Sequence, residues 1–154
     1  MSKDITKYIK TFEDAREALG NEHPYVQEYL NVVNINISQD IISYLKLRII
    51  TEALNDGWKP TFDEGEYRYY PWFFSYTKEE YDSLDEDEKK KCRIPSKLDN
   101  CDDMNASDLE YVYASFAGSY SYSSSGVRLT LKTKELAKYC GEQFIDIWID
   151  FLFK

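Results

Sequence analysis

Residues 66–76 read Glu-Tyr-Arg-Tyr-Tyr-Pro-Trp-Phe-Phe-Ser-Tyr and hold seven aromatic rings in eleven positions. Each aromatic side chain buries on the order of 150–250 Å² when it is enclosed. The segment is therefore expected to be either the central wall of the hydrophobic core or an exposed binding surface. The core is the default interpretation, and it predicts that most of these rings lie inside the protein.

The same stretch has the pattern of a β-strand with one interruption. Tyr67 and Tyr69 alternate with Arg68 and Tyr70, which is typical of a strand. Pro71 has no amide N–H to donate, so it predicts either an edge strand or an irregular turn at this point.

Two helices are predicted near the amino terminus. The first covers residues 12–19, with Thr11 as its cap and Gly20 at its end. The second opens at His23-Pro24, because proline suits the first position of a helix. His23 is therefore expected to act as a cap or turn residue rather than in catalysis.

Two longer helices are predicted further along the chain. One begins after Ser38 as cap and ends at residues 55–57, Asn-Asp-Gly. Its apolar face is predicted to contain Ile41, Ile42, Leu45, Ile49, Ala53 and Leu54. The other begins after Thr133 and runs from 134 to about 153, with only a narrow polar stripe. Such a helix is buried on several sides, either within this domain or against a second copy of the chain, and both alternatives stay open.

Two further strands are predicted at 110–117 and 127–132, because apolar and polar residues alternate in both. Residues 118–126 connect them and are expected to form a flexible loop or to extend either strand. We therefore predict one α+β domain over residues 1–154. It has amino-terminal helices, a small antiparallel sheet that includes the ring-rich stretch, and a long carboxy-terminal helix packed on the sheet.

Between the ring-rich stretch and the next strand the chain is strongly acidic. Thr77 and Glu80 have the spacing of a capping box, which predicts a short helix from Lys78 and a second turn over 85–91. Residues 92–109 lack periodicity and are expected to form a mobile surface loop. Residues 78–110 hold twelve acidic and six basic side chains, which places −6 of the total charge of −9 in this segment.

The composition limits the class of protein. An apolar content of 43% is too high for a disordered chain. A net charge of −9 disfavours nucleic acid as the main partner, because affinity for phosphates depends on Lys and Arg. No membrane-spanning segment and no signal peptide is recognised, so we expect a cytoplasmic protein.

No recognised reaction motif is present. The sequence lacks a phosphate-binding glycine loop and EF-hand spacing, and a single histidine, His23, offers no catalytic triad. We therefore expect no enzyme activity, no cofactor and no metal. Cys92, Cys101 and Cys140 read as reduced thiols, with Cys140 in a helix core. A disulfide or metal pair of Cys92 with Cys101 is the less favoured alternative.

Three segments together resemble a known group of proteins. They are 49–58 (Ile-Ile-Thr-Glu-Ala-Leu-Asn-Asp-Gly-Trp), 67–73 (Tyr-Arg-Tyr-Tyr-Pro-Trp-Phe), and 132–137 (Lys-Thr-Lys-Glu-Leu-Ala) followed by 143–148 (Gln-Phe-Ile-Asp-Ile-Trp). The pattern resembles small proteins of phages and integrated mobile elements of gut Bacteroidales bacteria, over most of the chain past residue 40. The resemblance implies a context rather than an activity: the bacterial cytoplasm during phage or element replication, or packaging in a virion.

The favoured function is non-enzymatic binding of a protein partner by an acidic accessory or inhibitor protein. Such a protein could imitate the charge of DNA and occupy a nucleic-acid enzyme of the host. Exposed rings and acidic residues would form the contact surface, because Tyr, Trp and Arg dominate interfaces. The predicted contact residues are Arg68, Trp72, Tyr76, Asp85, Glu86, Asp87 and Glu88.

Two alternatives belong to other classes. An accessory protein of DNA replication or recombination would stack single-stranded DNA on aromatic residues, at about 1–3 kcal/mol for each base. The residues for this role are Tyr67, Arg68, Tyr69, Tyr70 and Trp72. The negative flanks at Glu64 and Glu66 weigh against it. A small enzyme would need a pocket that joins His23 to carboxylates from distant segments.

Overall fold

The ring-rich segment forms one strand of an antiparallel sheet. The computed structural model of the protein describes residues 4–61, 65–92, 111–120 and 127–153. In these residues the sheet has two strands, β1 (Tyr67–Tyr76) and β2 (Tyr111–Tyr120), paired from Tyr67 opposite Tyr120 to Tyr76 opposite Tyr111. The predicted α+β class is confirmed, with the amino-terminal helices and the carboxy-terminal helices that pack on the sheet.

The helices that accompany the sheet are short, apart from the third. In the described residues they are the 3-10 turn η1 (Ile5–Lys7), α1 (Phe12–Leu19), α2 (Pro24–Val32), α3 (Gln39–Asn55), α4 (Lys78–Ser83), α5 (Glu86–Lys89), the 3-10 turn η4 (Val127–Leu129), α6 (Lys134–Gln143) and α7 (Ile145–Phe153). No helix in this part of the chain has both the length and the hydrophobicity needed to cross a membrane.

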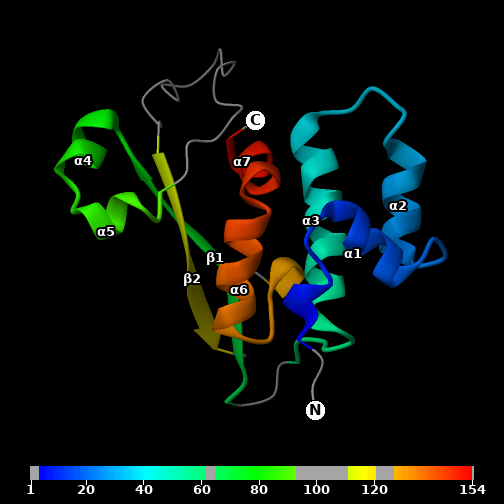
Figure 1. Ribbon diagram of the computed structural model, residues 1–154. Helices are drawn as coiled ribbons and strands as arrows, with labels where there is room; N and C mark the ends of the chain where they lie inside the picture. Colours follow the sequence, from blue (N-terminus) through cyan, green and yellow to red (C-terminus); the bar gives the residue numbers. More distant parts are fainter. Residues whose placement is uncertain (1–3, 62–64, 93–110, 121–126, 154) are drawn as a thin grey trace.

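The elements form layers around a core between the helices and the sheet (Figure 1). Helix α6 lies on one face of the sheet, and α4 and α5 lie on the other side of it. Helix α3 packs against α7 and α1, and α2 packs against the outer side of α3. Buried apolar residues from α1, α2, α3, α6 and α7 make the core continuous across these layers.

Local capping explains where several helices begin and end, as the sequence predicted. The hydroxyl of Thr11 accepts from the amide of Asp14 at 3.1 Å, and the Asp14 carboxylate accepts from the amide of Thr11 at 2.8 Å. His23 Nδ1 accepts from the amide of Tyr25 at 3.2 Å, so the predicted cap role of His23 is confirmed. Ser38 occupies the predicted N-cap position of α3, but its hydroxyl bonds the carboxylate of Asp40 instead of a helix amide.

Pro71 lies inside β1 without a break in the pairing. The amide and carbonyl of Tyr69 both bond Leu131, at 3.0 and 2.6 Å, on the side away from β2. Backbone groups in a strand point to the same side at every second residue, so the Pro71 nitrogen also points away from β2. Its missing N–H therefore costs no bond between the strands, which fits the predicted edge position.

The strand predicted over 127–132 is wrong. Val127–Leu129 forms η4, and only Leu131 pairs with β1, through a single bridge to Tyr69. The Asn55 side chain of α3 donates to the Thr130 carbonyl at 2.8 Å and accepts from the Lys132 amide at 3.1 Å. These two groups point away from β1, so the backbone on either side of Leu131 is bonded to α3 instead of to a further strand.

The predicted long carboxy-terminal helix is divided in two at Phe144, whose φ and ψ are −113° and 30°. Helix α6 approaches the sheet closely at Gly141, where an added Cβ would meet the Cβ atoms of Pro71 at 3.1 Å and Ala114 at 3.2 Å. Helix α7 turns toward α3, and its Phe151 ring stacks on Tyr44 at 5.8 Å. The break therefore lets one segment pack on two layers.

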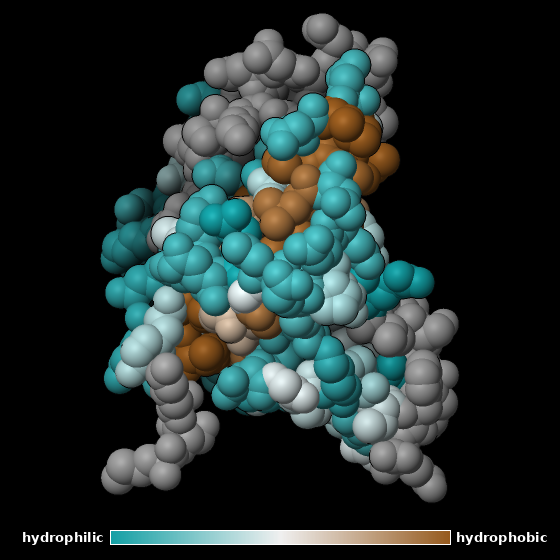
Figure 2. Space-filling view, turned by 90° about the vertical axis from the view of Figure 1, so that its right-hand side faces the viewer, coloured by the Kyte–Doolittle hydropathy of each residue, from teal (hydrophilic) through white to brown (hydrophobic). Residues whose placement is uncertain are grey.

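The side of the molecule on which α2 and α3 lie is apolar at one end. Figure 2 shows hydrophobic side chains gathered at the upper end of this face, the end at which α2 connects to α3. Ile35 in that connection is 57% exposed and Ile41 in the first turn of α3 is 46% exposed. Ile41 is thus not part of the buried face predicted for this helix. Contact of the chain with a second copy stays a prediction.

The Asn55 side chain provides a test of the link between α3 and the sheet. We expect Asn55→Ala to lower the free energy of unfolding by about 2–4 kcal/mol, because it leaves the Thr130 carbonyl and the Lys132 amide without their partner. Urea denaturation followed by circular dichroism measures the loss. Asn34→Ala, at an exposed position, is the control, and equal effects of the two substitutions would contradict the role of Asn55.

Candidate functional site

The expectation that the ring-rich segment fills the interior is wrong. The buried residues of β1 are Arg68 and Pro71, whereas Trp72 is 48% and Phe74 is 45% exposed. The physical reason is the width of the sheet in the described residues. Two strands place alternate side chains on two faces, and α6 covers one of these faces. Several rings are therefore left at the surface.

Strand alternation divides the rings of β1 between the two faces. Pro71 and Phe73 lie on the face toward the carboxy-terminal helices, since Pro71 contacts the Gly141 position and Phe73 packs on Trp148 at 5.7 Å between ring centroids. We call the opposite side the outer face of the sheet. By its alternation β1 contributes Arg68, Tyr70, Trp72, Phe74 and Tyr76 to the outer face.

The exposed rings of the outer face are fixed by pairing across the strands. Phe74 lies directly opposite Tyr113 of β2, and the two rings stack at 5.8 Å with an angle of 14° between their planes. Trp72 lies opposite Ser115, a residue with a small side chain. We call Trp72, Phe74 and Tyr113 the ring cluster. Its rings are held by a strand and its cross-strand partners rather than by a loop.

Acidic helices border the ring cluster. Helix α4 follows β1 directly through the capping box of Thr77 and Glu80, and Asp85 caps α5 by accepting from two amides at 2.9 and 2.8 Å. Both predicted helices are thereby confirmed. Residues 78–91 hold seven acidic and four basic side chains, which leaves a net charge of −3. We call α4 and α5 the acidic rim.

Tyr76 connects the ring cluster to the acidic rim. Partial burial and the nearby Cys92, Glu88, Tyr113 and Glu80 raise the pKa of the Tyr76 hydroxyl above its ordinary value. The influence of Glu88 and Glu80 indicates that carboxylates of both helices approach this ring. The structure therefore brings Tyr76 near Glu80 of α4 and Glu88 of α5, on the same strand face as Trp72 and Phe74.

Arg68 lies on the outer face by its register, but it does not belong to the exposed contact surface on which the sequence predicted it. Its side chain is fully buried, at 0% exposed, near the start of β1 and four residues from Trp72. A guanidinium enclosed in this way cannot reach a partner at the surface. Two residues that the sequence did not single out, Phe74 and Tyr113, complete the ring cluster instead. Only the pairing of β1 with β2 places Phe74 opposite Tyr113, and the sequence of either strand alone does not reveal this pairing.

The residues expected to bind single-stranded DNA do not form one platform. Tyr67 and Tyr69 stack on each other at 6.2 Å on the face toward α6, and Tyr69 also contacts Phe116 of that face. Tyr70 and Trp72 alternate in the other register, two on each side of the sheet. A single strand could stack on only part of this set from one side. The DNA-binding alternative stays a prediction.

His23 meets one carboxylate from a distant segment. Its Nε2 atom lies 3.9 Å from Oε1 of Glu52 in α3, whereas its Nδ1 atom caps α2. The separation from Glu52 is longer than a hydrogen bond. Within the residues that the structure describes, no group of three or more His, Cys, Asp or Glu side chains could hold a metal ion. The expectation of a protein without enzyme activity stays a prediction.

Comparison of the chain with family models, with curated proteins and with solved structures gives no match. The fold itself defines the class: an α+β protein with a ring cluster and an acidic rim on the outer face of its sheet. Cys101 and the loop expected over 92–109 lie outside the described residues, except Cys92 itself, so the pairing of Cys92 with Cys101 stays open.

The two described cysteines are expected to differ in reactivity. Cys140 is completely buried in α6, and burial raises the pKa of its thiol to about 12. Because the pKa lies above the solution pH, the thiol stays protonated at pH values near 8, where the reactive thiolate is needed. In a Cys101→Ser background, a disulfide reagent should modify one thiol, Cys92, in the folded protein and a second one only after unfolding.

The matched control adds Cys92→Ser to the same background. This variant should react with the reagent only in denaturant, and its absorbance change then reports Cys140 alone. Rapid modification of two thiols in the folded protein with Cys92 would contradict the burial of Cys140.

Proposed function

We propose that the protein is a non-catalytic binding protein that holds a basic protein partner on the outer face of its sheet. The observation that carries this proposal is the position of the ring cluster beside the acidic rim. Trp72 and Phe74 are about half exposed, and the helices that follow β1 carry a net charge of −3. The surface thus offers apolar anchors with charged residues at their border.

The rings of the cluster are of the residue types that contribute most of the binding energy in protein interfaces. Trp and Tyr are enriched among residues that dominate protein interfaces, where they are surrounded by polar residues that exclude water. Stacking of Phe74 on Tyr113 limits the freedom of both rings before binding. Little conformational entropy is then lost when a partner docks on them.

The acidic rim selects the chemistry of the partner. Surface carboxylates attract a partner that is rich in Lys and Arg and raise the rate of encounter, most strongly at low salt. Lys89 and Lys90 pair with Glu86 at 3.6 Å and Asp87 at 3.0 Å, yet acidic groups remain in excess. Enzymes that hold nucleic acid present such basic surfaces. The partner we propose is an enzyme of this class, and the protein is its accessory or inhibitor during phage or mobile-element replication.

The double variant Trp72→Ala/Phe74→Ala tests the ring cluster. The partner is first captured on the immobilised protein from a gut Bacteroidales lysate at low salt and then purified. We expect the variant to bind it at least about thirtyfold more weakly than the wild type, because a hot spot contributes about 2 kcal/mol or more. Ile41→Ala, at a similarly exposed apolar position on α3, is the control.

Capture of no basic protein, or equal affinity of the ring variant and the wild type, would remove the proposal. A labelled oligonucleotide is titrated in parallel at low salt. A rise in anisotropy that Trp72→Ala abolishes would instead favour the DNA-binding alternative.

Charge neutralisation on α5 tests the acidic rim. Glu86→Gln/Asp87→Asn removes two exposed carboxylates but keeps the cap residues Asp85 and Glu88 of this helix. We expect slower association and a weaker dependence of the association rate on salt, measured by surface plasmon resonance. Glu13→Gln/Glu17→Gln on α1 removes the same charge from another surface. If both pairs slow association equally, only the net charge of the protein matters and the rim has no specific role.

A further inference from the structure

A cleft at the carboxyl end of α3 has the features of a ligand site, on a different part of the molecule from the ring cluster. Its volume is about 360 Å³, which falls in the range of roughly 300–1,000 Å³ that is typical of small-molecule sites. Its lining includes Tyr25 of α2, Glu52 of α3, Trp58 and Lys59 after α3, and Arg128 of η4. We propose that this cleft binds a small anionic ligand that carries a flat ring.

The end of α3 positions one wall of the cleft. Asp56 and Gly57 have positive φ angles of 48° and 81°, so the chain turns back sharply where the helix ends. The amide of Trp58 then bonds the Asn55 carbonyl at 3.0 Å. This turn places Trp58 and Lys59 at the cleft that also contains Glu52, one helical turn earlier.

A second part of the lining, from Arg128 to Thr130, is held by the same residue that joins α3 to the sheet. The Asn55 side chain bonds the backbone of Thr130 and Lys132, and the Lys132 ammonium group donates to the Asn55 carbonyl at 3.2 Å. These bonds fix the segment that follows η4. Arg128 lies two residues before Thr130, whose carbonyl accepts from Asn55. Its side chain lines the cleft.

The Tyr25 ring is fixed in place before any ligand binds. Its neighbour His23 contacts it edge to face at 5.2 Å, and the guanidinium of Arg48 lies 4.0 Å from its ring centroid. Arg48 in turn pairs with Glu28. A ring that is packed in this manner can offer a flat surface for stacking at little cost in conformational entropy.

The charges in the cleft favour an anion. Glu52 is the acidic residue of the lining; its side chain is only 15% exposed, and it pairs with Lys59 and lies 3.9 Å from His23. Its charge is thus compensated within the protein. The Arg128 guanidinium is exposed and has no hydrogen bond or ion pair with the part of the chain that the structure describes. It is available for a carboxylate or a phosphate, which a guanidinium binds through two parallel bonds.

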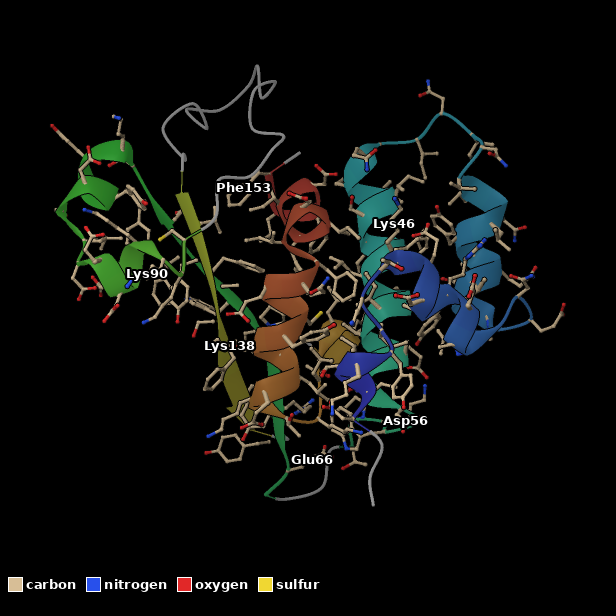
Figure 3. The ribbon with its side chains drawn as sticks, in the orientation of Figure 1. Lys46, Asp56, Glu66, Lys90, Lys138 and Phe153 are labelled. Carbon is tan, nitrogen blue, oxygen red and sulfur yellow. The ribbon has the colours of Figure 1, made fainter. Side chains whose placement is uncertain are left out.

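Two kinds of ligand share this chemistry. Tyr25 and Trp58 supply aromatic surface for a planar ring, and Arg128 supplies the donor pair for an anionic group. A nucleoside monophosphate and an aromatic carboxylate both combine these features. Figure 3 shows that Lys90 on α5 and Asp56 at the end of α3 lie on opposite sides of the molecule, so a ligand in the cleft leaves the acidic rim accessible.

The experiment uses the full chain and six probes. Adenosine, guanosine and cytidine monophosphate represent the phosphates, and indole-3-acetate represents the carboxylates. Adenosine and inorganic phosphate each provide one half of the chemistry. Binding is measured by calorimetry and by the nuclear magnetic resonance shift of the Trp58 indole N–H, which Trp58→Phe assigns among the three tryptophans.

We expect at least one ring-bearing anion to bind at submillimolar concentration and to shift the Trp58 resonance. Adenosine and inorganic phosphate should each bind more weakly than this anion. Arg128→Gln should weaken binding by about tenfold or more, because a charge-assisted hydrogen bond pair is lost. Arg128→Lys keeps the positive charge but lacks the planar guanidinium, so its affinity should lie between those of the wild type and Arg128→Gln. Lys138→Gln on α6 removes one positive charge elsewhere and should bind as the wild type does.

Binding of the monophosphates alone identifies a nucleotide site, and binding of indole-3-acetate alone identifies a carboxylate site. The proposal is overturned if no ring-bearing anion binds at millimolar concentration. It is also overturned if Arg128→Gln and Lys138→Gln bind equally well, since the anion would then not be held in this cleft. Neither result depends on the protein partner of the outer face.

Discussion

The amide side chain of Asn55 joins the helical layer to the sheet. It takes both a carbonyl and an amide of the segment 130–132, and Leu131 in the middle of that segment forms the bridge to Tyr69 of β1. Because Thr130 and Asn55 are almost completely buried, these bonds have no water to replace them. This side chain therefore bonds α3 directly to the segment beside β1, in addition to the packing of α6 on the sheet and of α7 on α3.

A sheet of two strands explains why so many rings are exposed. Each strand has two faces, and α6 fills one of them by close approach at Gly141. On the other face only the short α4 and α5 are available in the described residues, near Tyr76. Trp72 and Phe74 lie beyond their cover. Exposed aromatic surface of this kind lowers solubility, and in soluble proteins it often marks a binding site. For this reason we assign it a partner.

Local signals in the sequence predicted local structure well. Thr11 with Asp14, Thr77 with Glu80, and Pro24 each determine a helix start through neighbours only three or four residues away. The failures arose where distant residues decide. The alternation at 127–132 predicted a strand, but only Leu131 pairs with β1 and Asn55 bonds the residues on either side of it. The apolar run at 145–153 bends away to meet α3. Similarly, the cleft draws on α2, α3, the turn after α3 and η4, and no spacing along the chain indicates that these segments meet.

The close contact at Gly141 limits how this chain can diverge. Any larger side chain there would push α6 away from Pro71 and Ala114, whose Cβ atoms already lie at 3.1 and 3.2 Å from the place where a methyl group would stand. Surface positions can drift freely by comparison. The glycine in α6 and the proline inside β1 are thus tied together by packing, although they lie far apart in the sequence.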